Sequence, residues 1–410
     1  MSKRTKVFFC ILFCAIVMVF FGIVIFNQLK VGDFQPHIEW ARKLGSSGYL
    51  WLRANTLFQR LVLVTRDLLP FNFFARISKL AKQIIDIKSY DISALIVTIA
   101  AYLVSFIGVV KYFKQSLVLE ENKRNTILVY VLGLITLIVG PIILFSYPGR
   151  QYIGYINGNP FHNPTYTLMK PFAIFFFIFT INSLYKKVGW KEVLLSGLIL
   201  FLASIAKPNF TLSFIPSVGF VAIFLNFKRL KELNWKFFTI SIVFVSLFAL
   251  ITQYIIMYSG TRGDRVLFSP FTAIMAYLPD LPTIIGSILL SIVFPILIII
   301  VYWKKVKNQL SLTLVLVNFV ISFVISYSFM EQVDMLSLNF LWTIMFATFL
   351  LFMESIRIFV QEGILEFQNN NHKIMVKHII LGSVLLLHLV CGILFYFSSL
   401  SPISPVRLVS

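Results

Sequence analysis

VFFCILFCAIVMVFFGIVIFNQL, at residues 7–29, contains no charged side chain. About 20 consecutive apolar residues are enough for an α-helix to cross the hydrocarbon core of a bilayer. The segment is longer than the apolar region of a secretory signal peptide, and no small-residue cleavage site follows it. We therefore expect a retained signal anchor that forms the first transmembrane helix.

Similar apolar runs follow along the chain, at residues 91–113, 126–147, 165–185, 191–206, 208–226, 237–258, 283–302, 309–328, 338–356 and 378–398. Hydrophobic residues make up 59% of the 410 positions and charged residues 13%, against about 25% charged in soluble domains. The sequence predicts an all-α polytopic membrane protein with one transmembrane domain, residues 1–410, and about 11 transmembrane helices (10–12). The number of transmembrane helices depends on the region around Lys207-Pro208, where two short apolar runs form either a full or a partly re-entrant hairpin.

Lysine and arginine residues indicate the orientation, because they are retained on the cytoplasmic side of short loops. With a cytoplasmic N-terminus, the inner segments hold more than half of the 36 basic residues, at 3–6, 111–124, 186–191, 228–236, 304–307 and 357–377. This alternation predicts a multi-pass protein of the cell (plasma or inner) membrane. The net charge of +20 is dispersed between apolar runs, so we expect a lipid bilayer and no nucleic acid as partner.

The first outer loop, residues 30–90, is long and amphipathic. Apolar residues recur at helical spacing in 50–61 and again in 73–85, with charged residues opposite them. Burying such charges in hydrocarbon costs about 3 kcal/mol each, so these stretches are expected to be interfacial helices rather than spans. Pro36 fits the first turn of another short helix, with Ile38, Ala41 and Leu44 on its membrane face.

Polar residues gather in the predicted outer loops. Asp33 follows the first span, and the second outer loop, residues 148–164, contains two Asn-Pro pairs that favour extended or turn backbone. Arg150 suits an anionic group, while His162 and Asn163 suit hydroxyl groups. The alternatives are that Asp33 only caps the next helix and that the loop is an ordinary interfacial turn.

Three further outer segments carry charge. Lys207 lies between two short apolar runs, where a cation has either a functional task or simply extends to the membrane surface. Arg262 and Arg265 flank Asp264, which makes an exposed local ion pair the default interpretation. Glu331 precedes the tenth run, and Asn339 lies at its start.

Several chemistries are disfavoured by the sequence. It contains no Walker-type or dinucleotide-binding glycine loop, no HExxH, no clustered Cys and His, and no GxSxG. Outer carboxylates and cations on a lipid-facing body suit an enzyme that acts on a lipid-linked phosphate.

These residues resemble a known family. The order of elements is similar to that of the GT-C class of integral membrane glycosyltransferases. A first span is followed by Asp33 in Gly-Asp-Phe-x-x-His-Ile-x-x-Ala, then by interfacial helices and many spans. Segments 158–165, 206–210 and 331–342 also look like bacterial members. The resemblance implies that Asp33 is the catalytic base and that the donor is a sugar on a polyprenyl phosphate. It also implies an acceptor hydroxyl on a glycan, lipid or protein, and inversion at the anomeric carbon.

The family commonly has a second acidic residue beside the base, whereas here Glu39 lies six positions on. The sequence requires no cofactor and contains no metal-ligand cluster, but it leaves a divalent metal open. We assign substrate-binding roles to His37, Glu39, Arg150, His162, Asn163, Lys207, Arg262, Arg265, Glu331 and Asn339. The alternatives are a transporter, flippase or polymerase of surface polysaccharide or lipid-linked glycan, and a noncatalytic membrane scaffold.

Overall fold

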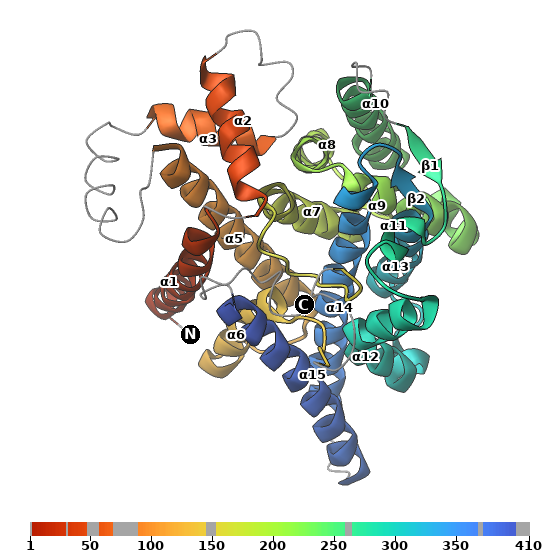
Figure 1. The fold of residues 1–410 in the computed structure, drawn as a ribbon. Coiled ribbons are helices and arrows are strands. Elements are labelled where there is room, and N and C mark those ends of the chain that lie inside the picture. The colour runs from red at the N-terminus through yellow and green to blue at the C-terminus, as the bar shows by residue number, and fades with distance from the viewer. Residues whose placement is uncertain are drawn as a thin grey trace.

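The computed structural model describes residues 2–29, 32–46, 57–68, 89–144, 153–258, 265–367 and 372–398, and most of them are helical (Figure 1). The first half contains α1 (Lys3–Gln28), α2 (Phe34–Ser46), α3 (Leu57–Leu68), α5 (Ser89–Ser116), α6 (Lys123–Ile138), α7 (Pro164–Ser183) and α8 (Trp190–Ala206). The second half contains α9 (Asn209–Phe220), α10 (Val245–Tyr258), β1 (Val266–Phe268), α11 (Thr272–Met275), α12 (Leu281–Val306), α13 (Leu310–Ser328), β2 (Phe329–Glu331), α14 (Leu341–Phe367) and α15 (His372–Ser398). Short π-helical or 3₁₀ segments occupy Val221–Leu225, Phe227–Glu232, Phe237–Phe244 and Met335–Ser337.

Length and composition identify the transmembrane helices. In the described ranges, eight segments are long and apolar enough to cross a bilayer: Arg4–Gln28, Ser89–Ser116, Pro164–Ser183, Phe237–Ile255, Leu281–Val306, Leu310–Ser328, Met335–Ile364 and Val376–Ser398. Shorter helices, α6, α8 and Asn209–Leu225, lie at other predicted spans. The prediction of an all-α multi-pass membrane protein is confirmed. The count of eleven, the orientation and the choice of membrane stay predictions.

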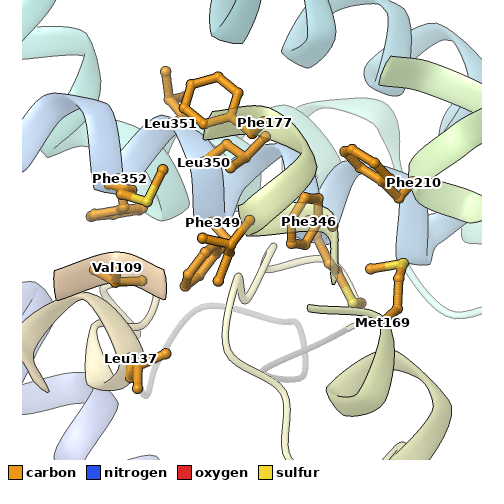
Figure 2. Close-up of a cluster of buried hydrophobic side chains, with 14 of the residues drawn as sticks. Val109, Leu137, Met169, Phe177, Phe210, Phe346, Phe349, Leu350, Leu351 and Phe352 are labelled. Atoms are coloured by element: carbon orange, nitrogen blue, oxygen red, sulfur yellow. The ribbon is translucent and has the colours of Figure 1, made fainter. Parts of the chain in front are cut away.

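Helix α14 packs against helices from both halves of the chain, namely α5, α6, α9, α12, α13 and α15. Its Phe346 and Phe349 lie on the side that faces Leu137 of α6 and Met169 of α7 (Figure 2). All four side chains are buried. Because lipid tails are as apolar as these side chains, close van der Waals packing rather than transfer from water holds the helices together.

The first outer loop contains the predicted short helices α2 and α3, which pack on each other and on α5 (Figure 1). The predicted lipid-facing stripe of α2 is instead buried in protein: Ile38 and Ala41 are fully buried and Leu44 nearly so. The expectation that these residues face the membrane was wrong, because α3 and α5 cover that face of the helix. Of the stretch 50–61, residues 57–61 are helical, while residues 50–56 and the stretch 73–85 lie outside the described residues.

The described part of the second outer loop, residues 153–163, is not a surface turn. Its side chains are buried or half-buried throughout. The backbone N–H of Ile156 donates to Ser291 Oγ at 2.8 Å, about 15 Å along α12 from Leu281 at 1.5 Å per residue. At Gly158 a Cβ atom would lie 2.9 Å from the backbone nitrogen of Phe349. The segment is therefore irregular backbone inserted between helices, which a membrane protein tolerates only where protein groups satisfy it.

A break in α12 helps to accommodate this insertion. Ile292 leaves helical geometry (φ −128°, ψ 17°), three residues before Pro295, whose ring cannot continue the hydrogen-bond ladder. The Phe294 N–H donates to His388 Nε2 at 3.4 Å, and His388 Nδ1 lies 2.7 Å from the carbonyl oxygen of Gly140. These contacts fit a neutral imidazole with its proton on Nδ1. His388 thus satisfies backbone groups on both sides of it.

Lys170, the seventh residue of α7, holds the inserted segment through hydrogen bonds. It is 1% exposed, and its Nζ donates to the Gly158 carbonyl at 3.1 Å and to Asn159 Oδ1 at 2.8 Å. Asn159 Nδ2 in turn donates to the carbonyls of Thr136 and Val139, each at 2.9 Å. A lysine in an apolar helix therefore connects the insertion to the end of α6.

A second buried charged group lies in α14, which continues past the predicted span end at residue 356. Arg357, which the charge pattern assigns to an inner loop, lies within this helix and donates to Glu354 Oε1 at 2.7 Å. Ser311 at the start of α13 donates to the same carboxylate at 2.8 Å, and Tyr112 of α5 also donates to it. Glu354 is fully buried, so this cluster joins three helices.

We predict that Lys170→Met lowers the melting temperature more than Lys191→Met, a change at an exposed position at the start of α8. Loss of the ammonium group leaves the Gly158 carbonyl and Asn159 Oδ1 without this donor, and a buried unsatisfied acceptor costs about 1–3 kcal/mol. Thermal unfolding of both variants in one detergent measures the difference. Equal melting temperatures would show that Lys170 does not hold the segment.

Candidate functional site

Asp33 and Asn163 meet at the end of the bundle where α1 leads into α2 and the inserted segment leads into α7. Gly32 makes the turn with φ +59°, a conformation that glycine adopts without steric cost. Asn163 Nδ2 donates to Asp33 Oδ2 at 2.7 Å. Two predicted site residues that are 130 positions apart are thus in direct contact.

The other end of the Asn163 amide caps α7. Its Oδ1 accepts the backbone N–H of Tyr166 at 2.9 Å and the hydroxyl of Thr165 at 2.7 Å, and Pro164 occupies the first helical position. A side-chain oxygen at this position satisfies a backbone donor that has no partner in the helix. Asn163 therefore fixes Asp33 relative to the start of α7, and its Oδ1 is occupied by this scaffold.

Lys207 brings a cation to the same place from the junction of α8 and α9. Its Nζ lies 4.6 Å from the centre of the Trp342 ring and donates to Thr165 Oγ1 at 3.4 Å. Burial lowers the pKa of Lys207 to about 8, while the negative charges of Asp33 and Glu331 act in the opposite direction. The ammonium group thus lies within the electrostatic reach of two carboxylates on different loops.

Both predicted histidines lie in this neighbourhood. The His162 ring is 5.3 Å from that of Trp342, and the His37 ring packs edge-on against Trp40 and Phe58. Burial and the charge of Lys207 lower the pKa of His37 to about 4, against the opposing effect of Asp33. Burial also lowers the pKa of His162, with Asp33 opposing and Lys207 adding to the decrease. Both imidazoles are therefore neutral near pH 7 and suit hydrogen bonding better than charge.

Glu331 and Asn339 form the far side of the site. Asn339 Nδ2 donates to Glu331 Oε2 at 2.6 Å, and Glu331 is 8% exposed at the end of β2. Asn209, at the start of α9, donates to the Asn339 carbonyl at 2.8 Å and to Thr343 Oγ1 at 3.1 Å. These bonds place the loop before α14 next to the α8–α9 junction and hence next to Lys207.

The remaining predicted residues are more peripheral. Arg265 precedes β1, and its carbonyl accepts the N–H of Gln332 at 2.9 Å, but its side chain is exposed. Glu39 pairs with Arg42 at 2.6 Å on the surface of α2, which is the geometry of a weak local ion pair. Arg150 and Arg262 lie outside the described residues.

Sequence reasoning assigned no site role to several side chains that build the site. Trp342 contacts both His162 and Lys207, Thr165 and Asn209 accept or donate within the hydrogen-bond network, and Gly32 forms the turn before Asp33. The sequence signals for these residues are local: a glycine directly before Asp33, and the position of the other three within segments 158–165, 206–210 and 331–342. Among the described residues, no three His, Cys, Asp or Glu side chains converge as metal ligands.

No protein-family model matches the chain, and no curated protein matches it.

We predict that Asn163→Asp and Asn163→Ala both lower the melting temperature at pH 7.5, for different reasons. Alanine removes the helix cap, which costs about 1 kcal/mol. Aspartate keeps a capping oxygen but replaces the donor to Asp33 with a like charge. Lowering the pH to 4.5 should therefore recover stability relative to the wild type only for Asn163→Asp, because protonation restores a donor. Thermal unfolding at both pH values measures this, and identical pH dependence in the two variants would contradict the contact.

Proposed function

We propose that this chain is a membrane glycosyltransferase that resembles the GT-C class and transfers a sugar from a polyprenyl-phosphate donor to a hydroxyl acceptor. The observation that carries the proposal is a chain of contacts in which Asn163 binds Asp33 and Thr165, and Lys207 binds Thr165. It holds one carboxylate and one cation within electrostatic reach of each other. The proposed location of the site is the outer face of the cell membrane.

The reaction needs two functions, and this arrangement supplies a candidate for each. The acceptor oxygen attacks the anomeric carbon, its proton passes to Asp33, and the bond between that carbon and the phosphate oxygen breaks. The leaving polyprenyl phosphate carries the negative charge, which Lys207 stabilises electrostatically without having to protonate it. A single displacement of this kind inverts the anomeric configuration. Asn163 occupies Asp33 Oδ2, so Oδ1 is the oxygen that takes the proton.

The neutral histidines and the Trp342 ring suit the sugar. The His162–Trp342 pair offers a hydrogen-bonding imidazole and an aromatic face to a hydroxylated ring. His37 offers a second imidazole within the electrostatic reach of Asp33 and Lys207. Glu331, held by Asn339, offers a second carboxylate within the electrostatic reach of Lys207. Its role in this proposal is to bind the acceptor or the sugar hydroxyls.

A transporter, flippase or polymerase of lipid-linked glycan is the alternative proposal, because such proteins place polar residues inside the membrane. The buried Lys170 and the buried Glu354–Arg357 pair are residues of that kind. Each, however, is bonded to the backbone or side chains of neighbouring helices. These contacts favour a structural role for both groups.

We predict that Asp33→Asn lowers sugar transfer about 10²- to 10⁴-fold, the usual contribution of a positioned base. The assay uses purified full-length protein with a polyprenyl-phosphate-sugar donor. Asp67→Asn, which changes an exposed carboxylate on α3, is the matched control and retains activity. Undiminished transfer by Asp33→Asn in a folded protein would overturn the assignment.

The pH dependence tests the cation. Lys207 is charged below its pKa of about 8, so wild-type transfer should fall as the pH rises from 8 to 10. Arginine stays charged throughout this range, so Lys207→Arg should retain its rate there, whereas Lys207→Met should be slow at every pH. Rates of the three proteins measured from pH 6.5 to 10 decide the matter. The same alkaline decline in wild type and Lys207→Arg would exclude Lys207 as its cause.

A further inference from the structure

The connection between α7 and α8, residues 184–189, lies at the end of these helices that is remote from Asp33. Helix α7 has 20 residues, which makes it about 30 Å long at 1.5 Å per residue. Helix α8 runs back along it to Lys207, which donates to Thr165 at the start of α7. The connection therefore faces the opposite side of the membrane from the proposed site.

Hydrogen bonds join this connection to residues 226–236, which lie between α9 and α10. Asn234 Nδ2 donates to the Lys186 carbonyl at 2.7 Å, and Lys236 Nζ donates to the Val188 carbonyl at 2.8 Å. Two segments that are distant in the sequence thus form one surface. We call residues 184–192 and 226–236 together the basic surface.

The basic surface carries an excess of positive charge, with seven basic and two acidic residues. Both carboxylates are engaged locally. Glu232 pairs with Arg229 at 2.8 Å, and Glu192 Oε2 lies 2.6 Å from the position that a Cβ atom of Gly189 would occupy, at the start of α8, where negative charge is favourable. In the part of the chain that the structure describes, the ammonium groups of five exposed lysines have no ion-pair partner: Lys186, Lys187, Lys191, Lys228 and Lys231. Such an excess favours an anionic partner.

Large aromatic side chains are exposed among these lysines. Trp190, Trp235 and Phe227 are 51–67% exposed. Basic residues mixed with Trp and Phe are typical of segments at the membrane–water interface, where the rings lie among the lipid headgroups.

The basic surface also continues into an apolar helix face. Leu194, Leu195 and Leu198 of α8 are 49–63% exposed, and the first of them lies one turn after the first residue of the helix. Positive charge, aromatic rings and a lipid-facing helix therefore follow one another along the membrane normal. This order favours a membrane lipid over a soluble acidic protein or a nucleic acid as the partner.

We propose that the basic surface binds anionic phospholipid headgroups, with the five lysines at the lipid phosphates and the exposed rings between the headgroups. Charge complementarity selects anionic over zwitterionic lipid. The predicted orientation assigns this binding to the cytoplasmic leaflet. It is independent of the proposed glycosyl transfer, since no group of the basic surface takes part in that reaction.

Quenching of tryptophan fluorescence by brominated lipids tests the proposal. Full-length protein is placed in phosphatidylcholine nanodiscs that contain the same fraction of either brominated phosphatidylglycerol or brominated phosphatidylcholine. The local signal is the quenching that is lost in the variant Trp190→Phe/Trp235→Phe. We expect phosphatidylglycerol to quench this local signal about twofold more than phosphatidylcholine. Equal local quenching by the two lipids would overturn the proposal.

Two charge-matched variants separate the basic surface from the net charge of the protein. Lys187→Gln/Lys231→Gln removes two charges from the basic surface, and Lys304→Gln/Lys307→Gln removes two at the end of α12. All four positions are exposed, so folding should be preserved, as thermal unfolding would verify. The first variant should lose about half of the excess quenching by phosphatidylglycerol, and the second should keep it. An excess that survives in the first variant, or that falls equally in both, would contradict a lipid site on this surface.

Ionic strength tests the cause of the selection. The Debye length falls from about 10 Å at 0.1 M salt to about 3 Å at 1 M. The excess quenching by phosphatidylglycerol should therefore disappear in about 1 M sodium chloride, while quenching by phosphatidylcholine should stay the same. An excess that is unchanged by salt would show that the lysines do not select the lipid.

Discussion

Backbone groups inside a bilayer must find hydrogen-bond partners within the protein, and this constraint shapes the molecule around residues 153–163. The segment is neither helix nor strand over most of its length, yet it lies among α6, α7, α12, α14 and α15. Lys170 and Ser291 bond to its backbone or side chains, and the Tyr396 hydroxyl donates to the Asn159 carbonyl at 3.0 Å. Asn159, within the segment, donates to two carbonyls at the end of α6. Because the insertion ends at Asn163, the same bonds that satisfy it also place this residue beside Asp33.

The proposed site follows from how several loops end at one place rather than from any single motif. Asn163 connects Asp33 to the start of α7, and Lys207 approaches from the α8–α9 junction. The strand pair aligns Val266 with Glu331, and Asn209 binds the carbonyl of Asn339. Two non-glycine residues in this last region, Phe271 and Leu338, have positive φ. Backbone strain of this kind tends to occur in functional loops. One cation, Lys207, thus lies within the electrostatic reach of two carboxylates, Asp33 and Glu331.

The sequence predicted the membrane fold because apolar length is a strong signal in lipid. It also singled out Asp33, Asn163, Lys207 and Glu331 as polar residues between spans, four side chains that the structure brings into one region. It failed where tertiary packing overrides a local pattern. The apolar stripe of α2 indicates a lipid face, but α3 and α5 cover it, and an Asn-Pro-rich loop gives no sign that it is buried. The burial of the α2 face and the burial of the loop both depend on contacts with other helices, and the residue pattern within one segment does not encode such contacts.

The central claim is that a polyprenyl-phosphate-sugar donor binds at Asp33 and Lys207. The most direct measurement is an electron cryo-microscopy structure of the wild-type protein with a non-reactive polyprenyl-phosphate-sugar analogue. We expect the phosphate to lie within hydrogen-bonding distance of Lys207 Nζ, about 3 Å, with the anomeric carbon facing Oδ1 of Asp33. A donor bound with its phosphate away from Lys207, or with its sugar remote from Asp33, would contradict the account.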